Sequence, residues 1–212
     1  MWDGFDVPGA TRHELRGFGQ TPMPPTGTFS HTDDLANAIG DQPVALVGAS
    51  FGGFACLQVA ATRPHLVTEL VLLDAPLFDR NWSDEIVRYQ REEDGLLEQG
   101  DLRGAAILNA NFWLTSPEPR DRVIEMQERA FELQQESEAE EVTPETVDLA
   151  AITARSLVTV GAFDRPDFHE IAEQLAREIP DTRHAVIAGA GHLPSLEQPE
   201  ETARLVREFL NG

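Results

Sequence analysis

The chain has 212 residues, 41% of them hydrophobic, which is enough to bury the core of a globular domain. Its formal net charge is −21, and all sixteen basic residues are Arg. Such a charge repels phosphate backbones and anionic lipids, so we expect neither nucleic acid nor a membrane as a partner. The absence of Lys excludes a Schiff-base lysine and the phosphate-binding Lys of a P-loop.

The first residues and the cysteine content together indicate a cytoplasmic protein. Met1 is not followed by the basic and then apolar segments of a signal peptide. No apolar run approaches the length needed to cross a bilayer. The single cysteine, Cys56, excludes an internal disulfide and a zinc site made of several cysteines.

Short apolar runs alternate with helical patterns, which predicts an α/β fold with a mostly parallel sheet flanked by helices. Ala10–Leu15 is a weak strand candidate, and Ser30 is the N-cap of a helix that ends near Gly40. Pro43–Gly48 has the composition of a buried strand. The later expected elements are a helix at Phe51–Arg63, a strand at Thr68–Asp74, a strand at Ser156–Gly161, a helix at Phe168–Ile179, a strand at His184–Ala188 and a helix at Glu200–Leu210.

Residues 76–146 interrupt this alternation with long helical segments and no strand candidate. Ser83, Asp101 and Ser116 are plausible N-caps of three such helices. We therefore predict two units, a core formed by residues 1–75 and 147–212 and an inserted helical unit formed by residues 76–146.

The strongest chemical signal is the segment Gly48-Ala49-Ser50-Phe51-Gly52-Gly53, between a predicted strand and a predicted helix. A serine at such a bend has a strained backbone and an exposed hydroxyl. The turn requires small residues two positions before and after the serine, where bulk would clash, and Gly48 and Gly52 meet this requirement. The N-terminus of the following helix places the Phe51 N–H where an oxyanion would develop. We interpret Ser50 as a nucleophile; the alternative is an ordinary glycine-rich turn.

A base and an acid for this serine can be assigned by position. His192 follows the predicted strand His184–Ala188 in a short glycine loop, so its ring can reach the edge where the serine lies. Asp164 follows the strand Ser156–Gly161 and would orient the imidazole. Asp74, at the end of an earlier strand, and Asp167 are alternatives for the acid; we favour Asp164, with which the order serine, acid, histidine is kept and each member follows its own strand.

Three segments together resemble the α/β-hydrolase superfamily, in particular its cap-bearing esterases, lactonases and cofactor-free haloperoxidase-like members. They are Leu15–Thr21, which contains Arg16-Gly17-Phe18-Gly19, the nucleophile segment Val47–Gly53, and the histidine segment Gly189–Glu200. The resemblance implies the α/β-hydrolase fold, a helical cap over residues 76–146, and a site that needs no metal and no organic cofactor.

Two departures from the family pattern bear on activity. Glu14 stands where the family usually has Asp, and the family's opening strands and His-Gly oxyanion loop have no counterpart. We therefore expect N-terminal strands that are missing or rearranged. The strand Ala10–Leu15 would then pair directly with Pro43–Gly48, or another chain would fill the gap, for example in a homodimer. Only one oxyanion donor, Phe51 N–H, is identified.

These observations predict a serine hydrolase that cleaves a small carboxylic ester, thioester or lactone through an acyl-enzyme on Ser50. A small molecule is the expected partner, and aromatic residues of the inserted helices are expected to line its pocket. The alternative, suggested by the missing oxyanion loop, is a weakly active or non-catalytic ligand-binding protein with the same fold. The candidate pocket residues are Trp113, Phe112, Trp82 and Phe78.

Overall fold

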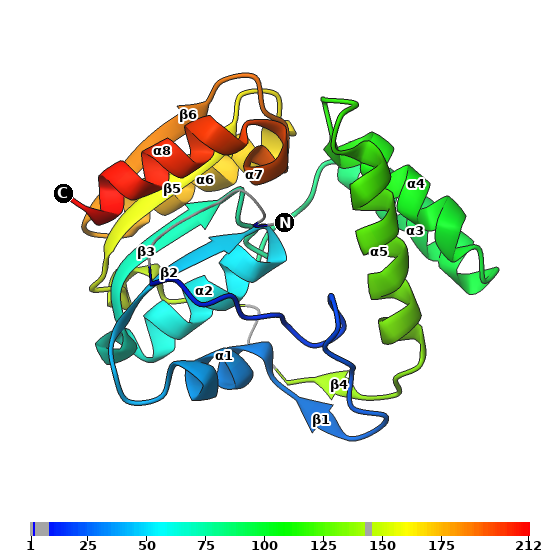
Figure 1. Cartoon of the computed structure of the whole chain (residues 1–212), viewed down its shortest axis with the longest axis horizontal. Helices are drawn as coiled ribbons and strands as arrows, with labels where there is room; N and C mark the ends of the chain where they lie inside the picture. Colours follow the sequence, from blue (N-terminus) through cyan, green and yellow to red (C-terminus); the bar gives the residue numbers. More distant parts are fainter. Residues whose placement is uncertain (1, 3–8, 143–145) are drawn as a thin grey trace.

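The computed structural model describes residues 2, 9–142 and 146–212. The expectation of missing or rearranged N-terminal strands concerns in part Met1 and residues 3–8, which lie outside the described residues. The predicted α/β fold is confirmed, because four parallel strands form a sheet in the order β2-β3-β5-β6 (Figure 1). The strands are β2 (Val44–Ala49), β3 (Val67–Leu73), β5 (Arg155–Gly161) and β6 (Thr182–Ile187).

Helices cover both faces of the sheet, and the side chains of β3 alternate between them. Leu70 and Leu72 point into a core shared with α1, α2 and α6, whereas Val71 and Leu73 pack against α8 on the opposite face. This two-sided burial explains why β3 is a continuous apolar run. The flanking elements are α1 (His31–Ile39), α2 (Phe51–Thr62), η1 (Pro64–Leu66), η2 (Leu149–Ala151), α6 (Pro166–Glu178), α7 (Pro194–Glu197) and α8 (Pro199–Leu210).

The ends of α1 show how local sequence sets an element boundary. The Ser30 side chain accepts a hydrogen bond from the Asp33 N–H at 3.2 Å, which satisfies a donor that the helix cannot pair internally. At the other end Gly40 has φ 71°, a conformation that glycine adopts without a steric cost. The expected start and end of this helix are both confirmed.

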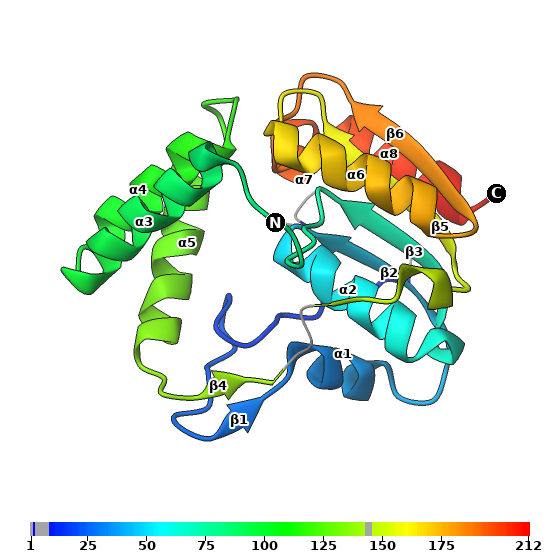
Figure 2. The same ribbon diagram turned by 180° about the vertical axis from the view of Figure 1, so that it is seen from behind.

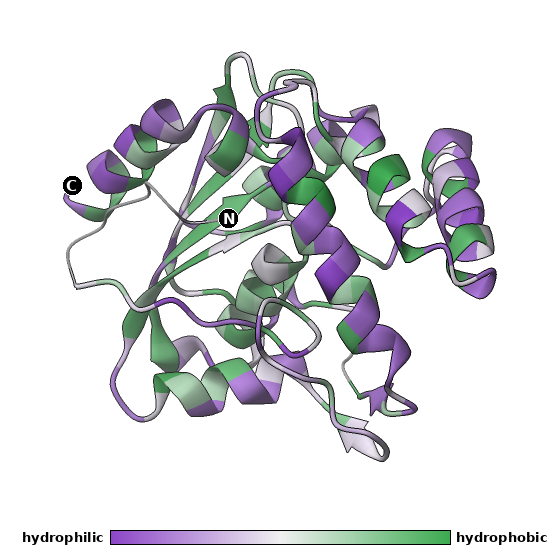
Figure 3. Cartoon of the chain, turned by 45° about the vertical axis from the view of Figure 1, so that its right-hand side comes forward, coloured by the Kyte–Doolittle hydropathy of each residue, from purple (hydrophilic) through white to green (hydrophobic). Residues whose placement is uncertain are grey.

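Three helices, α3 (Asp84–Glu98), α4 (Leu102–Trp113) and α5 (Arg120–Gln135), lie to one side of the sheet (Figures 1 and 2). Ser83 and Asp101 cap α3 and α4 as predicted. Ser116 does not start a helix: α5 begins four residues later, and the Ser116 N–H instead donates to the Glu197 carboxylate. Figure 3 shows hydrophobic and hydrophilic residues alternating along these helices, as expected for helices with one buried face.

The N-terminal part of the described chain departs from expectation. Ala10–Leu15 is not a strand and does not pair with β2, so the predicted direct pairing is wrong. Its side chains are mostly exposed, and a strand requires a partner's backbone to satisfy its polar groups. Among the described residues, β3 is therefore the only strand that pairs with β2.

A short parallel pair that the sequence did not predict joins this region to the end of α5. β1 (Thr28–Phe29) pairs with β4 (Glu140–Glu141), so the stretch between residues 76 and 146 does contain a strand. Each strand has only two residues, too few for a recognisable alternation of side chains. The pair connects the segment before α1 to the segment after α5.

Candidate active site

Three predicted side chains lie in hydrogen-bond contact at one edge of the sheet. Ser50 Oγ is 2.9 Å from Nε2 of His192, and His192 Nδ1 is 2.8 Å from Oδ2 of Asp164. They follow β2, β6 and β5, whose carboxyl ends share an edge because the strands are parallel. With its proton on Nδ1, the imidazole donates to Asp164 and accepts from the Ser50 hydroxyl. We call these residues the candidate triad.

The backbone at Ser50 aims its hydroxyl away from the helix that it precedes. Ser50 is the N-cap residue of α2, yet its side chain makes no capping hydrogen bond. Its φ of 48° is in a region that costs a non-glycine residue roughly 1–3 kcal/mol. Ser50 N donates to Leu73 O at 2.8 Å, and Phe54 N donates to Ser50 O at 3.1 Å, which together hold the turn.

Two glycines beside Ser50 are required by close backbone approach, but not the pair that was expected. A Cβ on Gly48 would lie 2.5 Å from Gly52 O and 2.7 Å from Gly53 Cα, and a Cβ on Gly53 would lie 2.7 Å from the Ala75 Cβ. A Cβ on Gly52 would meet nothing within 4 Å. The expectation that bulk at Gly52 would clash is therefore wrong, because this position faces open space.

Phe51 begins α2 and has two distinct parts that face the site. Its backbone N–H belongs to the first helical turn, where N–H groups have no acceptor within the helix and the helix dipole favours negative charge. Its ring contacts the rings of Phe18, His31 and Phe78, with centroids 6.1, 5.2 and 6.4 Å away. The residue thus supplies both a potential oxyanion donor and an apolar surface.

Asp164 is buried and fully engaged in hydrogen bonds. Oδ2 contacts His192, and Oδ1 accepts from the Arg165 N–H at 2.7 Å. Burial tends to raise the pKa of this carboxyl, but the adjacent His192 and the hydrogen bonds outweigh it, so its pKa is lower than usual. Asp164 is therefore ionised at neutral pH, as an acid that stabilises an imidazolium must be.

The two alternative acids occupy different positions. Asp167 lies in α6, and its Oδ1 accepts from the Ser83 N–H at 2.9 Å, so it anchors the start of α3. Asp74 follows β3 and is buried beside the candidate triad: single ligand-type atoms of Asp74, Asp164 and His192 lie within 4.8 Å of one another. This is the one cluster in the described part of the chain that offers three potential metal ligands; in it, His192 and Asp164 are hydrogen bonded to each other.

Glu197, to which sequence reasoning assigned no role, joins the histidine loop to the end of α4. Its buried carboxylate accepts five hydrogen bonds, with Oε1 facing the end of α4 and Oε2 facing the loop. The five donors are Thr115 N, Thr115 Oγ1, Ser116 N, Gly191 N and Leu193 N. The only sequence signal is its place five residues after His192, within the segment that carries the family resemblance.

The His192 ring packs against two aromatic side chains that also contact each other. The ring centroids of Trp113 and Phe168 are each 4.3 Å from that of His192. The backbone of Trp113 also contributes, because its carbonyl accepts from the His192 N–H at 3.2 Å. The last residue of α4 therefore fixes both the ring and the backbone of the histidine.

The other predicted pocket aromatics extend from this contact. Phe78 packs edge-on against Phe54 with centroids 4.6 Å apart. Trp82 contacts Phe78 and Phe168. Phe112 stacks on Tyr89 at 4.2 Å and lies under the Arg165 guanidinium at 4.1 Å. These side chains form a connected aromatic cluster that reaches His192 through Trp113 and Phe168.

A cavity of about 380 Å³ adjoins the Phe51 ring. Its lining combines apolar rings with a few polar side chains and comes from the N-terminal loops, β1, α1, α2, α5 and β4. The lining residues are Arg16, Phe18, Met23, Phe29, His31, Phe51, Gln134 and Glu141. None of the four predicted pocket aromatics is among them, so this cavity is a separate candidate for the substrate site.

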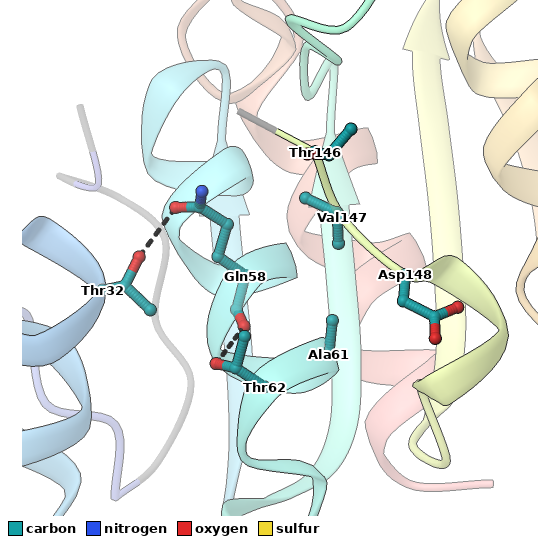
Figure 4. A pocket seen from close by; sticks show the side chains of 7 residues that line it. All are labelled: Thr32, Gln58, Ala61, Thr62, Thr146, Val147 and Asp148. Carbon is teal, nitrogen blue, oxygen red and sulfur yellow. Dashed lines mark hydrogen bonds between the residues drawn. The ribbon is translucent and has the colours of Figure 1, made fainter. Parts of the chain in front are cut away.

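A smaller hollow of about 80 Å³ lies beside the C-terminal half of α2, whereas Ser50 precedes its N-terminus (Figure 4). Within it Thr32 Oγ1 donates to Gln58 Oε1 at 2.7 Å, and Thr62 Oγ1 donates to Gln58 O at 2.7 Å. The first of these bonds ties α1 to α2, and the second lies within α2. Of the helices that can be described, none is long and apolar enough to span a bilayer.

Comparison with known proteins agrees with this fold. A model of the alpha/beta hydrolase family matches residues 7–205. The 2-hydroxymuconate semialdehyde hydrolase of Pseudomonas putida is 25% identical over an alignment of 213 residues, which covers 93% of this chain and 75% of that protein. Lipase LipV of Mycobacterium tuberculosis is 40% identical over 102 residues, which cover 46% of this chain and 39% of LipV.

Solved structures show the same architecture. An esterase from Thermogutta terrifontis superimposes with a TM-score of 0.72 at 28% identity, covering 93% of this chain and 78% of that one. The enol-lactonase from Burkholderia xenovorans LB400 also gives a TM-score of 0.72, at 18% identity and over 94% and 79% of the two chains, and so shares the fold. The match over most of its length shows that the chain belongs to the alpha/beta hydrolase family, and it is a hydrolase.

Proposed function

We propose that this hydrolase cleaves a small carboxylic ester, thioester or lactone through an acyl-enzyme on Ser50. The observation that carries the proposal is the continuous hydrogen-bonded chain from Ser50 Oγ through His192 to Asp164, with contacts of 2.9 and 2.8 Å. Such a chain lets a neutral imidazole accept the serine proton as the oxygen attacks. The esterase and lipase names of similar proteins support the same chemistry.

Acylation uses each member of the candidate triad once. Ser50 Oγ attacks the carbonyl carbon and its proton moves to Nε2 of His192, while the carbonyl electrons move to the oxygen. The Phe51 N–H donates to this oxyanion, and Asp164 stabilises the imidazolium. When the tetrahedral intermediate collapses, the carbon–oxygen or carbon–sulfur bond to the leaving group breaks, and the leaving group takes the proton from His192.

Deacylation repeats these steps with water as the nucleophile. Water gives a proton to His192 as its oxygen attacks the acyl carbon, and the bond to Ser50 Oγ then breaks as the proton returns to the serine. The products are a carboxylic acid and free enzyme. Trp113 lies against His192 in both halves at a tilt of 37°, and its electron-rich ring favours the cationic imidazolium over the neutral ring.

The cavity beside Phe51 supports a substrate with an apolar acyl or alcohol group. Phe51, which lines the cavity, is the residue directly after Ser50 in the sequence. The cavity volume of about 380 Å³ suits a small molecule. We propose that α3–α5 act as a cap over this region, because β4, directly after α5, pairs with β1 near the cavity. Residues 76–146 would then be the cap and the remainder the core.

The experiment that tests the function is covalent labelling combined with ester turnover. A fluorophosphonate should add its mass to Ser50 of the folded protein but not to the heat-unfolded protein. The Ser50→Ala variant should lose both labelling and hydrolysis of p-nitrophenyl acetate and butyrate. Turnover that survives Ser50→Ala would refute the proposal. Labelling of Ser50 without turnover above the variant would instead favour a ligand-binding protein that lacks an effective second oxyanion donor.

A further inference from the structure

Asp74 occupies a strained position next to the acid of the candidate triad. It lies one residue beyond β3, as Ser50 lies one residue beyond β2, and these are the two non-glycine residues with positive φ in the described part of the chain. Its φ is 49°. Asp74 N donates to Thr159 O at 3.0 Å, and its Oδ1 accepts from the Gly161 N–H at 2.8 Å. Strain of this kind persists only where the surroundings enforce it.

The second oxygen of the Asp74 carboxyl, Oδ2, accepts no hydrogen bond from the described residues. Asp74 is 2% exposed, and among the described residues no hydrogen-bond donor reaches Oδ2. The ionisable groups around it are Asp164 after β5, His192 after β6 and Glu197 in α7. Two of these are acids that already accept hydrogen bonds, and His192 directs its Nδ1–H to Asp164. A buried carboxylate oxygen without a donor is costly, whereas a carboxylic acid could donate from that atom.

We propose that Asp74 carries a proton on Oδ2 and donates it to the Asp164 carboxylate, and is thereby a positioning residue for the acid of the candidate triad. Its catalytic consequence rests on the proposed function, but the location of the proton does not. The proposed hydrogen bond joins Asp74 to Asp164 and not to the nucleophile. It acts by fixing the orientation of the carboxylate that holds His192.

Two carboxyl groups in contact share a single negative charge more readily than they carry two. Burial, and then the charge of Asp164, raise the pKa of Asp74 well above its usual value. The pKa of Asp164 is lowered, with the His192 contact outweighing the effect of burial. The pair therefore holds one proton on Asp74 and one charge on Asp164, where that charge can stabilise the imidazolium.

The first experiment locates the proton without using activity. An unfolded aspartate ionises at a pKa of about 3.9, so between that pH and the raised folded pKa only the unfolded chain releases the proton. The parent should therefore lose stability as pH rises through this window, and Asp74→Asn, which cannot ionise, should not share this loss. The melting temperature of Asp74→Asn minus that of the parent should increase from pH 4.5 to pH 8. Asp181→Asn, which changes an exposed carboxyl, is the control for loss of one charge.

A difference in melting temperature that does not change with pH would overturn the proposal, because Asp74 would then be ionised in the folded protein. This readout requires only folded protein, so it decides the question even if the chain hydrolyses no ester.

The second experiment measures the positioning role. An asparagine at this site can accept from Gly161 N–H through its oxygen and donate to Asp164 through its amide, as the protonated acid does. Asp74→Asn should therefore retain at least tenfold more of the parent kcat than Asp74→Leu, with KM little changed in both. Asp74→Ala, which is smaller and cannot donate from its side chain, serves as the non-donating variant if the leucine variant does not fold. Equal kcat for the donating and non-donating variants would refute the role, as would an Asp74→Asn variant as inactive as Asp164→Asn.

Discussion

Ser50 Oγ and His192 Nε2 are 2.9 Å apart, yet the two loops that carry these residues are held in place differently. The histidine loop is buried and held by hydrogen bonds: Glu197 accepts from Gly191 N and Leu193 N, and the His192 N–H donates to Trp113 O. The serine turn has a strained backbone, two glycines in close approach and a cavity beside it. The histidine loop is anchored by hydrogen bonds to a buried side chain, whereas the serine turn is held by two backbone hydrogen bonds and by close steric contact at its glycines.

This difference predicts how each loop fails. A hydrogen-bonded loop fails when a donor or acceptor is lost, because the remaining buried group is left without a partner. A sterically enforced turn tolerates polar change but not an added carbon atom. Substitutions at the two loops should therefore differ in the kind of damage as well as in its size.

The largest loss of activity is expected when the negative charge of Asp164, beside His192, is removed. Asp164→Asn cannot stabilise the imidazolium and favours the wrong tautomer, so kcat should fall by roughly 10³- to 10⁴-fold with little loss of stability. Steady-state hydrolysis of p-nitrophenyl butyrate measures this. Asp167→Asn is the matched control, because the Asp167 carboxylate accepts a hydrogen bond from Ser83 N and does not contact His192 through one. This variant should lower the free energy of unfolding and leave kcat little changed. A loss below tenfold for Asp164→Asn would point to Asp74 as the working acid.

A single added methyl group should distort the turn that carries Ser50. In Gly48→Ala the new Cβ would lie 2.5 Å from Gly52 O, which belongs to the backbone and cannot rotate away. We expect a loss of roughly 1–3 kcal/mol in unfolding free energy and about a hundredfold in the fluorophosphonate labelling rate, because Ser50 would shift relative to His192. Gly52→Ala, where the Cβ meets nothing within 4 Å, should keep or raise stability. Equal damage from both variants would contradict the steric account.

Glu197→Gln tests the hydrogen bonds of the histidine loop. A glutamine places an NH₂ group against N–H donors on one side, so at least one buried donor loses its acceptor at a cost of about 1–3 kcal/mol. Urea denaturation measures the change, and Glu200→Gln, at an exposed acid in the first turn of α8, should stay within about 0.5 kcal/mol of the parent. If the two variants were equally stable, the contact between α4 and the histidine loop would contribute nothing.

The smallest effect is expected from the aromatic contact with the imidazole. Trp113→Ala removes a ring 4.3 Å from His192, and a cation–π contact is worth about 0.5–2 kcal/mol, or roughly 2- to 30-fold in acylation rate. Phe112→Ala removes the neighbouring ring, which stacks on Tyr89 instead. The labelling rate of Ser50 should fall more for Trp113→Ala than for Phe112→Ala, and the reverse order would argue that the ring only packs the helices.

Much of the fold follows from local sequence. The caps at Ser30, Ser83 and Asp101 and the apolar runs of the four sheet strands each depend on a few neighbouring residues, and the structure has all of them. The approximate places of Ser50, Asp164 and His192 were also predictable, because each follows a recognisable strand and parallel strands end at one edge.

Other features depended on partners far away in the chain. Ala10–Leu15 has a weak strand pattern but no backbone to pair with, and Ser116 resembles an N-cap but binds Glu197, 81 residues later. Asp74 receives a hydrogen bond from Gly161, 87 residues away. Propensity and spacing act over one or two helical turns, so the sequence alone determined the order of the four sheet strands and most of the helices around them, and it pointed to the three residues of the candidate triad. Which polar groups share a buried site, and hence which carboxyl keeps a proton, was decided by the tertiary structure, because burial and the proximity of charges exist only once the chain has folded.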